Sequence, residues 1–411
     1  MNDVTRSSFV SVPEGAADGL RAKFRVPEGE ALRLCYLSVA DDAARVQQNW
    51  VARRDDPGSI KQAHAAMFFE AVEKLGAEGL MFSRFETEPV EGHPVRIAKV
   101  GEFPDRSDKR AMREKLKVLE REIAQFDPHA VILAQSMPMW FVPEIAGAYP
   151  TVLFLGSLQW PLPWEKNPTL KERLRLAVRK FRGRRQFRQV RGIVSGSQAG
   201  LDQVQGLVAR PLPVEWDMPQ FKGDYPYRPR AQARRLLFCG PLTAENGVYH
   251  VLDIFRALSR EVPDMELAFA GHGANADGLA AAAADLPNVH VEHSVSDANF
   301  REMVARADLC IASFGRQSHH GALDMLYATG LSGVPALVSS SLPLQGFQKA
   351  GCMRVEASDK DALEQGLRGL VLDDQQFVKL TADLPHDRAL HYDEKHSFGS
   401  GLVRVLQEMT L

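Results

Sequence analysis

The chain has 411 residues, which is long for a single compact core and sufficient for two domains. Hydrophobic residues make up 45% of it and charged residues 25%, the proportions of an ordinary soluble globular protein. The net charge of −2 argues against a general nucleic-acid binder, so no nucleic-acid partner is expected.

Neither terminal nor internal segments suggest membrane insertion or secretion. Residues 1–19 lack the apolar core of a signal peptide. No uninterrupted run of about 20 apolar residues occurs, which excludes a membrane span but leaves peripheral contact open. The cysteines lie far apart without metal-type spacing: Cys35, Cys239, Cys310 and Cys352. Buried, reduced thiols are expected, which favours the cytoplasm. A peripheral position on the inner face of the membrane is left open.

In chain order, residues 1–29 are polar and without a clear period, and we expect an N-terminal extension there. From Leu32 onward, strand and helix signals alternate. A buried strand is predicted over residues 32–40 and an amphipathic helix over 59–76, with Gly76 as its C-terminal cap. Further strands are expected at 130–134, 151–156 and 192–197, with helices at 141–149 and up to Leu207. This alternation predicts a parallel sheet covered on both faces, so residues 30–215 are assigned to one domain.

Around residues 210–230 the chain is rich in proline, which interrupts regular elements, and we place an interdomain linker at residues 216–233. Residues 234–395 then form a second domain of alternating elements. Its strands are expected at 234–240, 265–271, 289–293, 309–314 and 334–339, and its helices at 247–258, 299–307 and 321–333. The pattern is that of a doubly wound α/β unit.

Three loops of the second domain follow strands and precede helices, at residues 240–247, 271–275 and 314–321. In parallel sheets ligands bind at this edge, and helix N-termini there attract phosphate. The third loop contains imidazole and guanidinium groups that suit a phosphate. The predicted binding residues of the three loops are Gly240, Gly271, Gly273, Arg316, Ser318, His319, His320 and Gly321. The alternatives are that the glycines serve tight turns and that the histidines are solvated loop residues.

The order of segments in residues 234–409 resembles the donor lobe of glycosyltransferase family 4. The resemblance is carried by LLFCGPLTAENGVYHVLDIFRAL, LAFAGHGANADGL, VHVEHSVSDANFREMVARADLCIASF, GLSGVPALVS, GCMRVEASDKDALEQGL and HSFGSGLVRVLQEM. It implies an α/β protein of the GT-B fold, with two Rossmann-like doubly wound domains facing a cleft. It also implies a nucleotide-sugar site in residues 234–395 and a terminal helix, 396–411, that packs back on the N-terminal domain.

The chain departs from that family at the residues expected to hold the donor. Pro241 and Asn246 stand where active members usually have an Arg and a Lys, and His320 and Ala328 stand where two acidic residues are usual. The spacing from His319 to Pro335 also resembles family 1 transferases, in which a histidine meets the donor phosphate. His320 is therefore a candidate substitute for the missing cations. A donor with a single phosphate, such as a CMP-sugar, is the other explanation.

Residues 171–191 contain ten Lys or Arg residues against the single Glu172. Leu170, Leu174, Val178, Phe181 and Val190 are placed to form an apolar stripe on a helix. This combination predicts contact between the segment from Lys171 to Arg191 and an anionic membrane surface. The alternatives are a solvated helix face, or a site for an anionic acceptor or RNA.

The resemblance implies a glycosyltransferase, hexosyltransferase-like and independent of bound metal, with no cofactor besides its nucleotide-sugar donor. The acceptor is expected to be a glycan or lipid-linked hydroxyl. Asp41 is the first candidate for the catalytic base, with His320 on the donor side; Asp42, Asp55, Asp56 and His64 are the other candidates, all of them open to a structural role. A non-catalytic binding or scaffold subunit is the main alternative function, and a sugar-nucleotide epimerase is a third.

Overall fold

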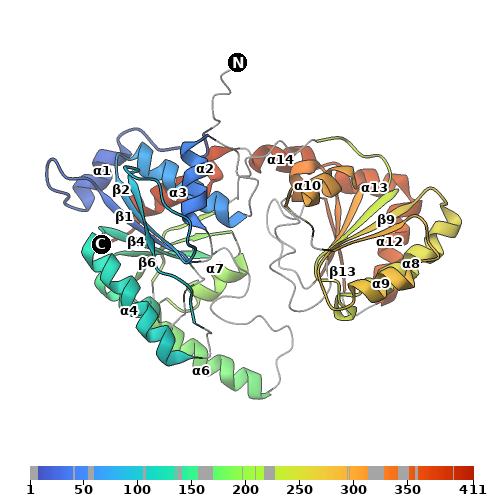
Figure 1. Cartoon of the computed structure of the whole chain (residues 1–411), viewed down its shortest axis with the longest axis horizontal. Coiled ribbons are helices and arrows are strands. Elements are labelled where there is room, and N and C mark those ends of the chain that lie inside the picture. Colours follow the sequence, from blue (N-terminus) through green and yellow to red (C-terminus); the bar gives the residue numbers. More distant parts are fainter. Residues whose placement is uncertain are drawn as a thin grey trace. The chain divides into compact units, whose positions relative to one another are not determined.

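The computed structural model describes residues 8–39, 42–53, 60–104, 108–134, 137, 141–155, 170–196, 198–208, 210–216, 227–293, 295, 297–312, 328–340, 351–356, 360–391 and 393–411. The chain divides into two compact units. The N-terminal unit comprises Met1–Lys222 and Asp393–Leu411, and the C-terminal unit comprises Gly223–Tyr392. Each is built around a parallel sheet (Figure 1).

The N-terminal unit has a seven-stranded sheet in the order β3-β2-β1-β4-β5-β6-β7. Its strands are β1 (Arg33–Leu37), β2 (Glu78–Ser83), β3 (Val95–Lys99), β4 (Ala130–Ala134), β5 (Thr151–Leu155), β6 (Val190–Ser195) and β7 (Val214–Trp216). Successive side chains of β1 belong to opposite faces: Leu34 and Tyr36 enter one apolar cluster, whereas Cys35 and Leu37 enter another. Both faces of the sheet are therefore buried, which explains the continuous apolar runs of its central strands.

Helices supply the apolar side chains that cover these two faces. They are α1 (Ala16–Lys23), α2 (Ala43–Val51), α3 (Ile60–Lys74), α4 (Lys109–Phe126), α5 (Val142–Ala148), α6 (Leu170–Gln186), α7 (Gln198–Gln205) and α15 (Phe398–Glu408), with a short 3-10 turn at Glu394–His396. The last helix, α15, contacts α3, β6, β7 and α1. The chain thus returns to the N-terminal unit at its end.

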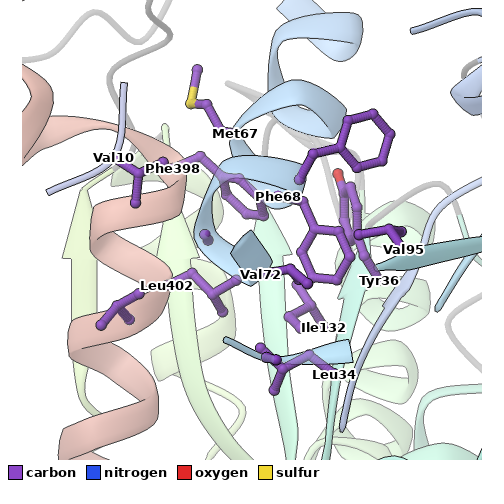
Figure 2. Close-up of a cluster of buried hydrophobic side chains, with 14 of the residues drawn as sticks. Val10, Leu34, Tyr36, Met67, Phe68, Val72, Val95, Ile132, Phe398 and Leu402 are labelled. Atoms are coloured by element: carbon purple, nitrogen blue, oxygen red, sulfur yellow. The ribbon is translucent and has the colours of Figure 1, made fainter. Parts of the chain in front are cut away.

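Figure 2 shows how α3 and α15 share one core, with Phe68 and Phe398 beside Tyr36 of β1. The ring of Phe398 lies 5.5 Å from that of Tyr36 and 4.6 Å from that of Phe154. Gly399 makes this approach possible, because a Cβ there would lie 2.5 Å from Val10 Cγ2 and 2.9 Å from the Met67 carbonyl oxygen. Both ends of the chain therefore meet in this cluster.

The expected N-terminal extension contains a helix, α1, that the sequence pattern did not predict. Its Leu20 is fully buried, as is Val10 in the segment before it. The carboxylate of Glu70 on α3 accepts hydrogen bonds from the Phe9 amide at 3.1 and 3.0 Å and from the Ser8 hydroxyl at 2.8 Å. Residues 8–23 are thus packed on α3 and α15, through buried side chains such as Val10 and Leu20 and through the hydrogen bonds to Glu70.

The C-terminal unit has a six-stranded parallel sheet in the order β10-β9-β8-β11-β12-β13. Its strands are β8 (Arg235–Cys239), β9 (Glu266–Gly271), β10 (Val289–His293), β11 (Leu309–Ala312), β12 (Ala336–Ser339) and β13 (Cys352–Val355). The helices are α8 (Val248–Glu261), α9 (Ala276–Ala282), α10 (Asp297–Arg306), α12 (Lys360–Leu372), α13 (Asp374–Thr381) and α14 (Leu384–His391), with a 3-10 turn at Ala244–Asn246. This strand order is that of a doubly wound Rossmann-like sheet.

The chain enters this sheet beside a buried guanidinium. Arg230 is 6% exposed and donates to the carbonyl oxygens of Ala307 at 2.7 Å and Ser332 at 2.7 Å. It also donates to the carbonyl oxygens of Ala305, Gly333 and Arg228. Burial lowers the pKa of Arg230 to about 10, which still leaves it charged at neutral pH. One side chain thus satisfies the carbonyls at the end of α10 and those before β12.

The structure contains further strands and a helix that were not expected from the sequence. Strand β7 forms within the proline-rich stretch, at the edge of the sheet where a strand needs only one partner. Strands β2 and β3 and helix α4 were not predicted individually. Among the described helices, none combines the length and the apolar content that crossing a bilayer requires.

Candidate functional site

The candidate site lies at the point where the strand order of the C-terminal sheet reverses. Strand β8 is the neighbour of both β9 and β11, and Cys239 at its end pairs with Ala312 at the end of β11. The connections after these two strands run in opposite directions across the sheet, which leaves a crevice at such a switch point. Gly240 begins the loop after β8. The predicted residues Arg316 to Gly321 follow β11 in the sequence and lie outside the described residues.

The two described loops of the site, 240–247 and 271–275, are hydrogen-bonded to each other beyond the ends of their strands. The amide of Leu242 donates to the His272 carbonyl oxygen at 2.9 Å, and the amide of Asn275 donates to the Leu242 carbonyl oxygen at 3.1 Å. The side chain of Asn275 adds a third link, because its Oδ1 accepts from the Ala244 amide at 3.0 Å. The loops therefore form one braced unit.

Glycine is required at the two predicted positions of the second loop for a steric reason. A Cβ on Gly271 would lie 2.0 Å from the Gly240 carbonyl oxygen, and one on Gly273 would lie 2.4 Å from the Leu242 carbonyl oxygen. Real Cβ atoms do not come so close to backbone, so any side chain would force the loops apart. Gly240 itself has φ 138°, a conformation that L side chains rarely adopt. All three glycines thus serve the packing of the loops.

The side chain of Asn246 holds the first loop in its tight turn. Its Nδ2 donates to the Pro241 carbonyl oxygen at 3.0 Å and to Thr243 Oγ1 at 2.9 Å, and the residue is 6% exposed. Pro241 and Asn246 stand at the two positions where the resemblance leads one to expect cations. Neither side chain carries a positive charge, and in this chain both residues stabilise the loop itself.

Helix α8 begins directly after this turn, at Gly247, which has φ 79° and no side chain with which to cap the helix. The positive end of the helix dipole therefore points towards the braced loops. Backbone amides at such a helix start are a general binding arrangement for phosphate. The described part of the site thus offers backbone dipoles where side-chain cations are missing.

Cys239 is the last residue of β8, directly before the first loop, and Cys310 lies on the neighbouring strand β11. Cys239 is 4% exposed, and burial raises the pKa of its thiol well above the usual range, an effect that a hydrogen bond with Cys310 reinforces. A protonated buried thiol is a poor nucleophile. Both cysteines are free and buried, as expected from the sequence.

Residues 333–335, the Gly-x-Pro segment directly before β12, are held in place by close packing. Gly333 has φ 65°, and a Cβ there would lie 2.3 Å from Cε2 of Tyr227. The guanidinium of Arg388 lies 5.4 Å from the centre of the Tyr227 ring and donates to the Leu331 carbonyl oxygen at 2.8 Å. Ala328, at a position where the resemblance leads one to expect an acidic residue, is 3% exposed. A carboxylate there would be buried.

Most of the predicted catalytic and phosphate-binding side chains fall outside the described residues. Asp41, Asp55 and Asp56 on the N-terminal unit do so, as do the five predicted residues of the third loop: Arg316, Ser318, His319, His320 and Gly321. Their roles stay predictions. Within the described residues, no group of three or more His, Cys, Asp or Glu side chains is arranged to hold a metal ion.

The two described alternatives for the base both have structural roles. Asp42 is the N-cap of α2: its Oδ1 accepts from the Arg45 amide at 3.2 Å, and its Oδ2 accepts from Thr87 Oγ1 at 2.7 Å. His64 is 4% exposed, and its ring lies 4.5 Å from that of Phe154 and 5.3 Å from that of Phe398. Asp42 thus caps a helix and His64 is enclosed by aromatic rings. Asp41 stays the first candidate, as a prediction from the sequence.

Comparison with known proteins identifies the fold. No protein-family model matches the chain, and no curated protein matches its sequence. The solved structures that resemble it include sucrose-phosphate synthase from Thermosynechococcus elongatus (TM-score 0.61, 12% identity, 88% of this chain and 95% of that one). WaaG, a glycosyltransferase involved in lipopolysaccharide biosynthesis, has a TM-score of 0.61 and 14% identity over 91% of this chain and 100% of its own.

Anabaena HepE, solved in complex with UDP and glucose, has a TM-score of 0.54 and 11% identity over 92% of this chain and 97% of its own. At such identities the matches establish architecture. The chain has the GT-B fold, with two Rossmann-like domains, and the whole fold is covered because the matches include nearly all of both chains.

Proposed function

We propose that the protein is a glycosyltransferase that moves a sugar from a nucleotide-sugar donor to an acceptor hydroxyl. The observation that carries the proposal is the pair of braced loops, 240–247 and 271–275, at the switch point of the C-terminal sheet. They lie where open α/β sheets bind ligands, in a chain whose fold matches glycosyltransferases over most of its length. The UDP and glucose of the HepE structure belong to that protein and make a nucleotide-sugar the first donor class to test.

The donor phosphates would be held by backbone amides and the dipole of α8, together with the loop that follows β11. Arg316, Ser318, His319, His320 and Gly321 of that loop are the proposed phosphate-binding residues, and Gly240, Gly271 and Gly273 shape the surface against which the nucleotide lies. His320 takes the place of the two missing cations. No bound metal is required by this arrangement, because fixed positive groups support the leaving phosphate.

On the acceptor side, we propose Asp41 as the general base. In the sequence it comes four residues after the end of β1, a central strand, and directly before Asp42, the N-cap of α2. A carboxylate there would take the proton of the acceptor hydroxyl as the sugar is transferred. The acceptor would be a glycan or a lipid-linked glycan, and the closed site would exclude water from the reacting atoms.

Turnover assays with a panel of nucleotide-sugars and glycan acceptors test this proposal. Transfer by the wild type, and its loss in His320→Ala and in Asp41→Asn with folding retained, are the expected results. His319→Ala is the matched variant for the neighbouring imidazole, and a smaller loss is expected there.

Two outcomes would replace the proposal. Nucleotide binding without transfer to any acceptor would favour a non-catalytic subunit, which the replacement of the usual donor-site side chains at Pro241, Asn246, His320 and Ala328 also supports. Conversion of the donor to an epimeric sugar without an acceptor would favour an epimerase.

A further inference from the structure

Helix α6 carries a row of apolar side chains that the fold leaves exposed. Eight large apolar side chains are exposed in the described part of the chain, and four of them lie on this one helix. Leu170 is 84% exposed, Leu174 69%, Val178 45% and Phe181 79%. Removing such side chains from water lowers the free energy. A contiguous exposed group of them therefore marks a surface that contacts another apolar phase.

The spacing of these four residues puts them on one side of the helix. At roughly 100° per residue, positions 170, 174, 178 and 181 fall within an arc of about 80°. Exposed basic residues border this apolar stripe on both sides. By the same geometry one flank carries Lys171, Arg175 and Arg182, and the other carries Arg173, Lys180 and Arg184, all of them exposed.

The helix is attached to the N-terminal unit by the opposite side. Gly183 is buried, and a Cβ there would lie 3.0 Å from the side chain of Leu207, which is itself 2% exposed. In the helical projection Gly183 falls roughly 180° from the middle of the apolar stripe. Helix α6 also contacts α5. The stripe is therefore exposed because the helix is anchored on its far side.

We propose that α6 is a membrane-docking surface that lies flat on a bilayer containing anionic phospholipids. The stripe of Leu170, Leu174, Val178 and Phe181 would enter the boundary between headgroups and acyl chains, while the two basic flanks would meet the lipid phosphates. The charge supports this occupant: α6 carries eight of the ten Lys or Arg of residues 171–191, against one Glu, in a chain whose net charge is −2. The attraction is therefore local to this helix.

The apolar stripe favours a lipid surface over RNA. A phosphate backbone is bound by cations and by aromatic side chains that stack on bases. Three of the four exposed apolar residues are aliphatic, and they lie between the cations. Long basic side chains can extend to the lipid headgroups while the apolar stripe lies deeper, among the acyl chains. The charges and the apolar area then match the polar and the apolar layer of a bilayer. The inference does not depend on donor binding and goes beyond the proposed function.

Co-sedimentation of the full chain with vesicles tests the proposal. The probes are vesicles of phosphatidylcholine alone and of phosphatidylcholine with roughly 30% phosphatidylglycerol, at about 0.15 M salt. The wild type should bind the anionic vesicles and should bind the neutral ones at least tenfold more weakly. Higher salt should weaken the binding to anionic vesicles.

Two variants separate the contributions of charge and of apolar area. Lys171→Gln, Arg175→Gln and Arg182→Gln together remove one flank; at roughly fivefold per residue, they should lower the partition coefficient about a hundredfold. Leu174→Ser with Phe181→Ser removes half of the stripe without changing any charge and should lower it at least tenfold. All five side chains are exposed, so the fold should survive, and circular dichroism checks this.

A matched control comes from α4, whose apolar side is buried against the sheet. Arg110→Gln, Lys117→Gln and Arg121→Gln remove three exposed cations from that helix, the same change of net charge as in the flank variant. Binding to anionic vesicles should then stay within about threefold of the wild type. An equal loss in the α4 control would overturn the proposal, because it would make the attraction a matter of net charge alone.

Three further results would also overturn it. The first is that the wild type stays in the supernatant with anionic vesicles. The second is that the apolar variant binds vesicles as well as the wild type while the flank variant loses affinity for a single-stranded oligonucleotide, which would assign the helix to RNA. The third is that sedimentation velocity without lipid shows a dimer that Leu174→Ser with Phe181→Ser dissociates, which would make the stripe a contact between two copies of this chain.

Discussion

The side-chain amide of Asn246 donates a hydrogen bond of 3.0 Å to the carbonyl oxygen of Pro241. These two residues occupy the positions at which a family 4 glycosyltransferase is expected to hold its donor diphosphate with cations. Here they are hydrogen-bonded to each other. Asn246 also donates to Thr243 Oγ1, and these bonds stabilise the turn that leads into α8. The donor site we propose therefore rests on shaped backbone and on residues of the loop after β11.

Asn246→Asp should weaken both the fold of the first loop and nucleotide binding. The substitution keeps the size of the side chain but replaces a donor with a carboxylate that faces the Pro241 carbonyl oxygen. We expect the free energy of unfolding to fall by about 1–3 kcal/mol, measured by urea denaturation. Glu245→Gln is the control, because Glu245 is an exposed neighbour in the same turn. Equal effects of the two substitutions would contradict the bracing role.

Phe398→Ala should destabilise the N-terminal unit strongly although the residue lies near the end of the chain. Its ring is fully buried against Tyr36, Phe154 and His64. Removal of such a ring costs about 3–5 kcal/mol. Val378→Ala, at a residue that is 49% exposed, should change stability by less than about 0.5 kcal/mol. Thermal and urea unfolding of the two variants provide the comparison, and a loss below about 1 kcal/mol in Phe398→Ala would argue against the packing described.

Arg230→Lys should destabilise the C-terminal unit although it preserves the charge. A lysine has one nitrogen in place of the three of the guanidinium and cannot serve the five carbonyl oxygens that Arg230 now serves. With several buried carbonyls left short of donors, we expect a loss of about 3 kcal/mol or more. Arg260→Lys on the exposed side of α8 is the control and should be close to neutral. Similar unfolding curves for both variants would contradict this assignment.

The free energy of unfolding should decrease at acidic pH, and part of this decrease should come from His129. Its Nδ1 accepts a hydrogen bond of 2.9 Å from the Arg33 amide, and the pKa of the imidazole is lowered, first by burial and then by the charge of Arg33. Below about pH 6.5 the unfolded chain takes up a proton that the folded chain resists. The free energy of unfolding therefore decreases as the pH falls through this value, until the lowered pKa of the folded state is reached.

His129→Gln should flatten that pH dependence, because the titrating group is gone while an acceptor oxygen remains for the Arg33 amide. Urea denaturation at several pH values between about 5 and 8 measures it. His290→Gln, at an exposed position of β10, is the control. A pH dependence unchanged in His129→Gln would show that this histidine does not contribute.

The alternating architecture could be predicted from the sequence because its central strands are buried on both faces. Residues 32–40 gave the position of β1 and residues 247–258 that of α8, since a short apolar run and a 3.6-residue period are strong local signals. The polar helix α1 carried no such signal. Only Ala16 and Leu20 of its eight residues are buried, and the core that they enter also includes side chains of α15, at the other end of the chain.

The candidate site could be predicted in outline only. Glycines after β8 and β9 marked the loops, but the reason for Gly273 is its distance from the Leu242 carbonyl, which lies in another loop. The bridge from Asn275 to the Ala244 amide spans 31 residues and has no local pattern. Such contacts depend on tertiary packing, which the local periodicity of apolar residues in the sequence does not predict.

Isothermal titration with UDP, GDP, TDP and CMP tests the central claim, a nucleotide-binding site at the braced loops, most directly. We predict that at least one of them binds the wild type more tightly than about 1 mM. Gly273→Ala should weaken that binding about tenfold or more with the fold retained, because its Cβ would force the loops apart. Gly19→Ala, where a Cβ meets nothing within 4 Å, should bind like the wild type. Absence of binding by all four nucleotides, or equal binding by Gly273→Ala, would contradict the claim.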